Sequence, residues 1–253
     1  MLGLCVFAAF AVSALGAAVA SAEGGPEGGT PGFNKCVKAT KVGKTYTGEY
    51  TEKECKTKAS PAKTGKYEVQ AVTSGTFEGK SKVTTLTTHT TNGVAVTVVC
   101  KKDKYRGSIV FENEVVEETI VFEDCLGNGS KTDPCGNAAP ETIETDPQEG
   151  ELVWLNEGKT EAGMLLAGSQ FAAFKCGTEE VEVDGFVIGT ASLGGKAPTI
   201  TFAVNGSKEQ AHKTFWLLST LGPFGLYTEP KAGEKVESTL QSVETQKGPA
   251  PVS

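Results

Sequence analysis

The sequence predicts an all-β protein whose strands form an antiparallel β-sandwich, with a β-barrel as the alternative. Thr, Val and Gly are abundant, and these residues favour strands and turns over helices. From about residue 75, short apolar runs are separated by turn residues, and no segment keeps a helical period beyond one turn near 207–213. This pattern does not separate the sandwich from the barrel.

The clearest single element is a hairpin. Asn92-Gly93 lies between KVTTLTTHT and VAVTVVC, and this dipeptide favours a type I′ turn, in which both central residues need a positive φ. In the second run Val94, Val96, Val98 and Cys100 recur at every other position, so they share one face of the strand.

The remaining strands follow with short turns between them. In 180–188, Val181 and Val183 alternate with Glu182 and Asp184, as in a strand with one face in solvent. The other expected strands are 107–112, 115–124, 151–156, 161–166, 170–176, 199–205, 214–219, 224–228 and 236–245.

The chain opens with 22 uncharged residues that end in Ala20-Ser21-Ala22. This ending suits cleavage between Ala22 and Glu23, so 1–22 is expected to be a signal peptide and the protein to be secreted. A signal peptide normally starts with Lys or Arg, which this segment lacks. The rival interpretation is an uncleaved anchor, and only then would the protein contact a membrane.

Four regions follow the signal peptide. Residues 23–33 are rich in Gly, Pro and Glu and are expected to be a flexible linker. Residues 34–70 form a small Cys-flanked unit with few apolar residues, expected to pack on the main domain. Residues 71–247 form the antiparallel β domain, and 248–253 a disordered tail.

Six cysteines follow the signal segment, and an even number in an exported chain indicates disulfides. Local spacing favours Cys36–Cys55 and Cys125–Cys135. Cys100 and Cys176 remain, and each ends a strand on an apolar face, so we expect them to pair. Zinc sites usually contain closely spaced Cys pairs, which are absent, so we expect no metal and no cofactor.

The chain has a net charge of −7 and one arginine, Arg106. Proteins that bind nucleic acids need clustered Arg and Lys to displace counterions from phosphates. This composition therefore argues against a nucleic-acid partner and against binding to anionic membranes.

Four segments carry a resemblance to a known group of proteins. They are CVKA and GEYTEKEC within 36–55, GKYE at 65–68, TDPQEGEL at 145–152 and FAAFKCG at 171–177. In these segments the chain resembles an uncharacterised family of secreted, Cys-containing, β-rich proteins of soil-dwelling high-GC Gram-positive bacteria. The resemblance implies secretion, a compact β domain and a surface or environmental role, and it supplies no catalytic residue.

Candidate catalytic groups are few. The sequence contains no Gly-x-Ser-x-Gly motif that would supply a nucleophilic serine for a histidine base. We therefore interpret the two histidines, His89 and His212, as surface residues. A calcium loop at Asp124–Ser130 is disfavoured because Leu126 replaces an oxygen ligand. Two acidic runs could hold a glycosidase pair of carboxylates, although solvated strand faces also explain them. These acids are Glu112, Glu114, Glu117, Glu118, Glu123, Asp124, Glu179, Glu180, Glu182 and Asp184.

Trp154, Trp216 and Tyr227 could line a sugar-binding face, but both tryptophans lie in dense apolar runs that favour the core. The leading hypothesis is a monomeric, non-enzymatic binding or structural module, with a polysaccharide or cell-envelope component as partner. The alternative is a secreted, carboxylate-dependent hydrolase of the glycosidase type.

Overall fold

The computed structural model describes residues 31–111, 114–192, 199–205, 209–211, 225–231, 234–247 and 250–252. The expected signal peptide 1–22, the linker up to residue 30, and the expected strand 214–219 with His212 and Trp216 lie outside these ranges.

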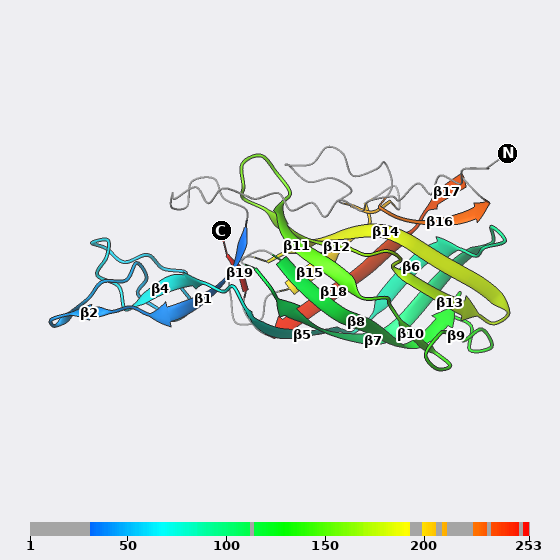
Figure 1. The fold of residues 1–253 in the computed structure, drawn as a ribbon, viewed down its shortest axis with the longest axis horizontal. Coiled ribbons are helices and arrows are strands. Elements are labelled where there is room, and N and C mark those ends of the chain that lie inside the picture. The colour runs from blue at the N-terminus through cyan, green and yellow to red at the C-terminus, as the bar shows by residue number, and fades with distance from the viewer. Residues whose placement is uncertain are drawn as a thin grey trace, which may run out of the picture.

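All regular structure in the described ranges is β-strand, so the expected all-β class is confirmed (Figure 1). The strands are β1 (Gly32–Lys38), β2 (Lys41–Val42), β3 (Thr45–Tyr46), β4 (Tyr67–Ala71), β5 (Gly75–Ser81), β6 (Thr84–His89), β7 (Ala95–Ile109), β8 (Glu114–Gly127), β9 (Cys135–Gly136), β10 (Thr142–Glu144), β11 (Gln148–Trp154), β12 (Ala162–Ala167), β13 (Ala172–Cys176), β14 (Glu179–Ala191), β15 (Thr199–Phe202), β16 (Leu226–Lys231), β17 (Glu234–Glu237), β18 (Thr239–Lys247) and β19 (Ala250–Val252).

The main domain is a closed antiparallel barrel, which is the alternative and not the favoured sandwich. Eight strands pair in the order β8-β11-β12-β14-β15-β18-β5-β7, and β7 then pairs with β8 to close the ring. The closing pair is long, because β7 has 15 residues, β8 has 14, and they pair along most of their length.

One position in the barrel wall is filled by two short strands. β5 and β6 follow one another along β7 and are separated by Lys82 and Val83. On their other side, β18 pairs with β6 through Thr239–Gln241 and with β5 through Thr245–Lys247. The residues in between, 242–244, therefore lie opposite the interruption, and the ladder between β18 and these two strands is broken there.

The barrel encloses a continuous apolar core. Strand alternation produces it, since Val96, Val98 and Cys100 of β7 are buried while the residues between them are partly exposed. Phe77, Leu152 and Met164 are among its largest fully buried side chains, whereas Ile188 belongs to a second, smaller cluster with Val153 and Phe186. Full burial of one such side chain stabilises the fold by about 2 kcal/mol.

The Cys36–Cys55 disulfide is confirmed, but the other two expected pairs are wrong. Cys100 bonds Cys125, and Cys135 bonds Cys176, with Cα–Cα distances of 4.0 and 4.1 Å. Each pair consists of residues directly opposite one another in the ladder, on β7 and β8 and on β9 and β13. Cross-strand register therefore decides the pairing, and spacing along the chain does not.

The hairpin between β6 and β7 is confirmed, but its turn is not type I′. Gly93 has a φ of 81°, and Asn92 is not among the residues with positive φ. The Gly93 N–H donates to the Thr90 carbonyl and the Thr90 N–H donates to the Val94 carbonyl. The loop thus spans three residues, with Gly93 at the left-handed position that a glycine fills best.

Strands β1 to β4 build the small N-terminal unit, which projects beyond one end of the barrel (Figure 1). Within 34–70, Ala39 is the one buried apolar side chain, and the two cysteines are partly exposed. The tail 248–253 was expected to be disordered, but Ala250–Val252 forms β19, which pairs with β1 from Gly32 to Asn34.

Candidate functional site

The outer face of the barrel over β5, β7 and β18 is hollowed and basic. One hollow of about 960 Å³ lies over the break in the wall, and we call it the lysine groove. Val83 and Val243, each 55% exposed, supply aliphatic surface within it. The residues that line it are Lys80, Ser81, Lys82, Val83, Thr85, Lys101, Lys102, Gln241, Ser242, Val243 and Thr245.

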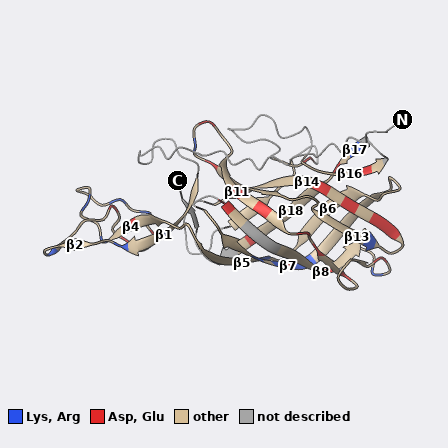
Figure 2. Cartoon of the chain, viewed as in Figure 1, with Lys and Arg blue, Asp and Glu red and all other residues tan. Residues whose placement is uncertain are grey.

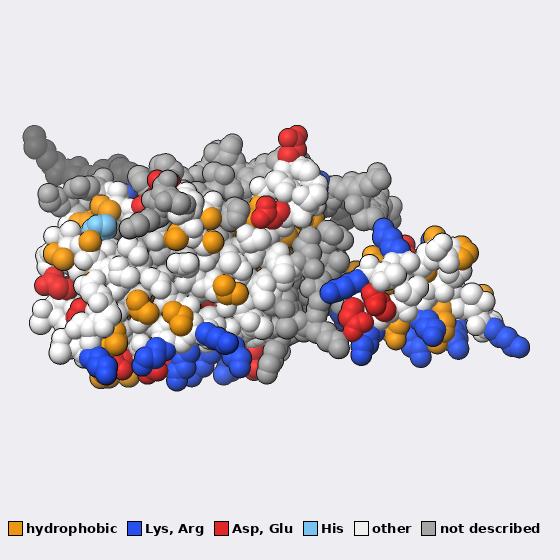
Figure 3. All heavy atoms as spheres, turned by 180° about the vertical axis from the view of Figure 1, so that it is seen from behind, with side chains coloured by type: hydrophobic (Ala, Val, Ile, Leu, Met, Phe, Trp, Pro, Cys, Tyr) orange, Lys and Arg blue, Asp and Glu red, His pale blue; other side chains and the backbone are white. Residues whose placement is uncertain are grey.

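Local strand structure places these lysines on one face. In β7, Asp103 is buried and Lys102 and Lys104 are exposed, as alternation requires. Lys101 is exposed beside Lys102, so the alternation of β7 is interrupted here, and Asp124 of β8 has a φ of 56°. Figure 3 shows Lys and Arg side chains gathered along this edge of the barrel.

A second hollow of about 520 Å³ continues the same face. It shares Lys80 and Thr245 with the lysine groove and adds Lys104 and Arg106 from β7. Thr119 and Val121 of β8 form another part of its lining, together with Glu78, Gly79 and Tyr105. The two hollows together make an elongated surface, which suits an extended ligand better than a compact one.

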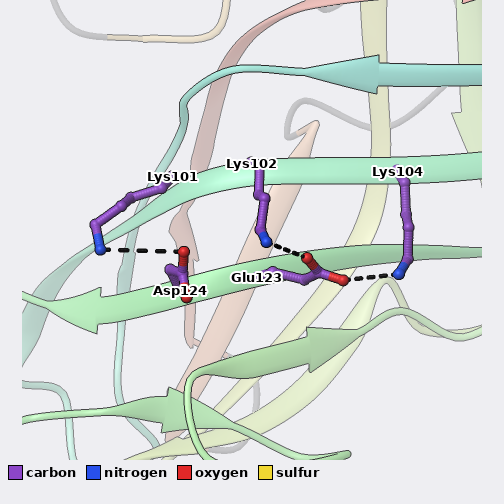
Figure 4. Close-up of polar contacts among 5 residues, drawn as sticks. All are labelled: Lys101, Lys102, Lys104, Glu123 and Asp124. Atoms are coloured by element: carbon purple, nitrogen blue, oxygen red, sulfur yellow. Dashed lines mark hydrogen bonds and ion pairs between the residues drawn. The ribbon is translucent and has the colours of Figure 1, made fainter.

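Two acidic residues of β8 hold the lysines of β7 in place (Figure 4). Glu123 contacts Lys102 at 2.8 Å and Lys104 at 2.7 Å, and Asp124 lies 4.0 Å from Lys101. Hydrogen bonds from Lys102 and Lys104 lower the pKa of Glu123 to about 2, and Glu123 in turn raises the pKa of Lys102. Solvent screens exposed ion pairs of this kind and they contribute little to stability, so an anionic ligand can compete for the lysines.

The face has a charge opposite to that of the whole chain. Six basic residues lie on it, Lys80, Lys82, Lys101, Lys102, Lys104 and Arg106, against the three acids Glu78, Glu123 and Asp124. Counted over these nine side chains, and without the buried Asp103 and Glu244 beneath them, the charge is +3 on a chain of net −7. Figure 2 shows the opposite distribution along β14, where acidic residues predominate.

A buried polar cluster lies beneath the break in the wall. Asp103 is 3% exposed and accepts hydrogen bonds from the Ser81 N–H and from the hydroxyls of Ser81 and Thr84. Nearby on β18, the Ser242 hydroxyl donates to Glu244. The bonds to Asp103 satisfy its buried carboxylate where the ladder is interrupted, and thereby fix this edge of the groove.

The expected candidates for acid and base catalysis are mostly scattered. Glu179 accepts a hydrogen bond from Asn92, and Glu180 pairs with Lys175 at 2.9 Å. Glu182 is exposed. Glu112 lies outside the described residues, and the side chains of Glu117 and Glu118 are not described. His89 lies on β6, and its buried Nδ1 has no hydrogen-bond partner among the described residues, so no acid in that part of the chain orients the ring through Nδ1 as a triad requires.

Two carboxylate pairs come together that the spacing along the chain did not reveal. Glu114 of β8 lies directly opposite Glu151 of β11, and burial together with Glu114 raises the pKa of Glu151. The second pair is Asp184 and Glu229. Burial raises the pKa of Asp184, a hydrogen bond with Gln170 lowers it, and the negative charge of Glu229 raises it. Glu151 is not in either acidic run, and only the strand register identifies it.

The aromatic candidates do not form a sugar-binding strip in the described part of the chain. Trp154 is 6% exposed and packs in the core, as expected. Tyr227 lies opposite Asp184 on the neighbouring strand, and the Lys235 ammonium covers its ring at 3.9 Å from the centroid. Trp216 lies outside the described ranges.

Among the described residues, no three His, Cys, Asp or Glu side chains are grouped to hold a metal ion. Within the same ranges, no helix is long and apolar enough to cross a membrane. No protein-family model matches the chain, and no curated sequence or solved structure shows significant similarity to it.

Proposed function

We propose that this protein is a secreted, non-enzymatic binding module that holds acidic polysaccharide along the lysine groove, at or outside the cell surface. The observation that carries the proposal is the continuous basic face on an otherwise acidic barrel. Three disulfides support an oxidising destination, since such bonds persist outside the reducing cytosol.

The chemistry of the groove favours a polysaccharide over a nucleic acid. Lysine ammonium groups attract the carboxylates of uronic acids, and the exposed valines offer aliphatic surface to the C–H faces of sugar rings. Proteins that hold single-stranded nucleic acids rely on exposed aromatic rings for base stacking. The aromatic ring that lines these hollows is that of Tyr105, which is 6% exposed and belongs to the core.

The test is a calorimetric titration of the protein with polygalacturonate at several salt concentrations. Binding should weaken as salt rises, because each occupied lysine releases a counterion from the polymer. The triple variant K80Q/K82Q/K101Q should lose at least tenfold in affinity. A matched control, K131Q/K159Q/K175Q, removes the same charge elsewhere and should retain most of the binding.

Two outcomes would overturn the proposal. One is a wild-type protein that does not bind the polymer at low salt, and the other is equal loss in both triple variants. Stronger binding to single-stranded DNA of equal charge density would replace polysaccharide by nucleic acid as the ligand.

A second candidate function, a carboxylate-dependent hydrolase, is favoured by the Glu114–Glu151 pair. A raised pKa on one of two facing carboxylates is what a general acid beside an ionised partner requires. The same mixtures should therefore be assayed for new reducing ends. Reducing ends that appear with the wild type and not with E151Q would make the protein an enzyme.

A further inference from the structure

The N-terminal unit is far more basic than the rest of the chain. Residues 34–70 contain nine of the 24 basic residues and four of the 31 acidic ones. The unit therefore carries +5 and the remainder of the chain −12. All nine lysines are exposed: Lys35, Lys38, Lys41, Lys44, Lys53, Lys56, Lys58, Lys63 and Lys66.

Two of these lysines converge on one tyrosine. The Lys41 ammonium lies 4.7 Å from the centroid of the Tyr46 ring, and that of Lys38 lies 5.8 Å from it. Lys41 is directly opposite Tyr46 in the β2–β3 hairpin, and Lys38 ends β1 just before it. Gly43, with a φ of 63°, makes the tight turn that brings the two short strands together.

The electrostatics of this cluster favour an anion. Desolvation alone would raise the pKa of Tyr46, yet hydrogen bonding and charge from Lys38 and Lys41 lower it. Two ammonium groups beside one ring repel each other, and a carboxylate between them would relieve that repulsion. The phenol O–H of Tyr46 would then donate to the same carboxylate, as in other charge-assisted hydrogen bonds.

We propose that Lys38, Lys41 and Tyr46 form an anion clamp, and that the N-terminal unit is a second binding element for the acidic polymer. This inference rests on the proposed function, because it assigns the clamp to the same ligand as the lysine groove. The disulfide Cys36–Cys55 closes the unit around this hairpin, so the clamp is held on a braced support.

The position of the unit fits one polymer chain that contacts both elements. In Figure 3, basic side chains lie along the lower edge of the barrel and again on the unit that projects from its end. A chain long enough to reach both would bind the second element at high effective concentration, which raises affinity by a factor on the order of 10²–10⁴. A short oligomer would occupy one element at a time.

The experiment compares trigalacturonate with long polygalacturonate on the same protein by calorimetry. The wild type should bind the long chain at least tenfold more tightly per site than the trimer. K38Q/K41Q should lose most of this advantage while the trimer still binds the lysine groove. Y46F keeps the ring and both lysines but removes the hydroxyl donor, and should lose a smaller part of the affinity advantage of the long chain.

The matched control is K56Q/K58Q, which removes the same charge from the same unit away from Tyr46. If this control loses as much of the long-chain affinity advantage as K38Q/K41Q, the proposal of a clamp is wrong and the unit attracts polymer only through its total charge. If the long chain binds no more tightly than the trimer, the second element is absent while the proposed function stands. If neither ligand binds the wild type, the proposed function itself fails. Circular dichroism and a thiol count check that each variant is folded and oxidised.

Discussion

The N-terminal unit and the barrel are held together by different interactions. Within 34–70 one apolar side chain other than cysteine is buried, and the Cys36–Cys55 bridge spans most of the unit. The barrel instead encloses a continuous apolar core, and its two disulfides join strands that already pair. The unit therefore depends on a covalent link, whereas the barrel depends on burial and gains extra stability from its disulfides.

The largest expected effect on this comparison comes from the barrel core. Leu152 is fully buried, so L152A removes apolar contacts and leaves a cavity, which should lower the free energy of unfolding by about 3 kcal/mol. Chemical denaturation followed by Trp fluorescence measures the loss. A matched L155A, at a partly buried position, should cost less. Equal losses would show that the interior is not tightly packed.

The second effect is on the unit alone. The double variant C36S/C55S removes a link between residues 19 apart in sequence, which costs about 3 kcal/mol in the loop-entropy model. Because the unit has almost no core, its amide protons should exchange rapidly with solvent while those of the barrel strands stay protected. Hydrogen exchange with mass spectrometry distinguishes the two. Loss of protection throughout the barrel would mean that the regions fold as one.

The smallest effect on stability, but a useful one for binding, comes from Glu123. Its folded-state pKa of about 2 lies below the ordinary value of 4.5, so its contacts with Lys102 and Lys104 stabilise the fold above pH 4.5 and are lost as the pH falls through about 2. A carboxyl carbon NMR titration should show this low midpoint. E123Q frees both lysines, so polygalacturonate should bind more tightly to it than to the wild type. Unchanged or weaker binding would mean that these lysines do not contact the polymer.

Much of the fold could be predicted because strand alternation is a local property of the sequence. Val181 and Val183 are buried and Glu182 is exposed, as the pattern of 180–188 indicated. The closed barrel could not be predicted, because closure depends on the register between β7 and β8. The same register places Cys100 opposite Cys125, so the open choice between sandwich and barrel and the wrong disulfide pairs have one cause.

The overall composition did not reveal the candidate site. A net charge of −7 argued against a nucleic-acid partner and against binding to anionic membranes, yet that total averages a basic face, a basic unit and an acidic remainder. A local signal was present, since lysines recur at every other position on both sides of the Asn92-Gly93 hairpin, at Lys80 and Lys82 and at Lys102 and Lys104. Such alternation places Lys80, Lys102 and Lys104 on one outer face once β5 and β7 pair, and Lys82 follows β5 directly, in the break of the wall.

The pairing of β19 with β1 has a practical consequence. From Gly32 to Asn34 the backbone groups of β1 are matched on one side by Ala250–Val252. Proteolytic trimming of those three residues would uncover a bare strand beside the basic unit, and bare strands invite strand exchange between molecules. Preparations for polymer binding should therefore keep this end intact, or aggregation could be mistaken for avidity.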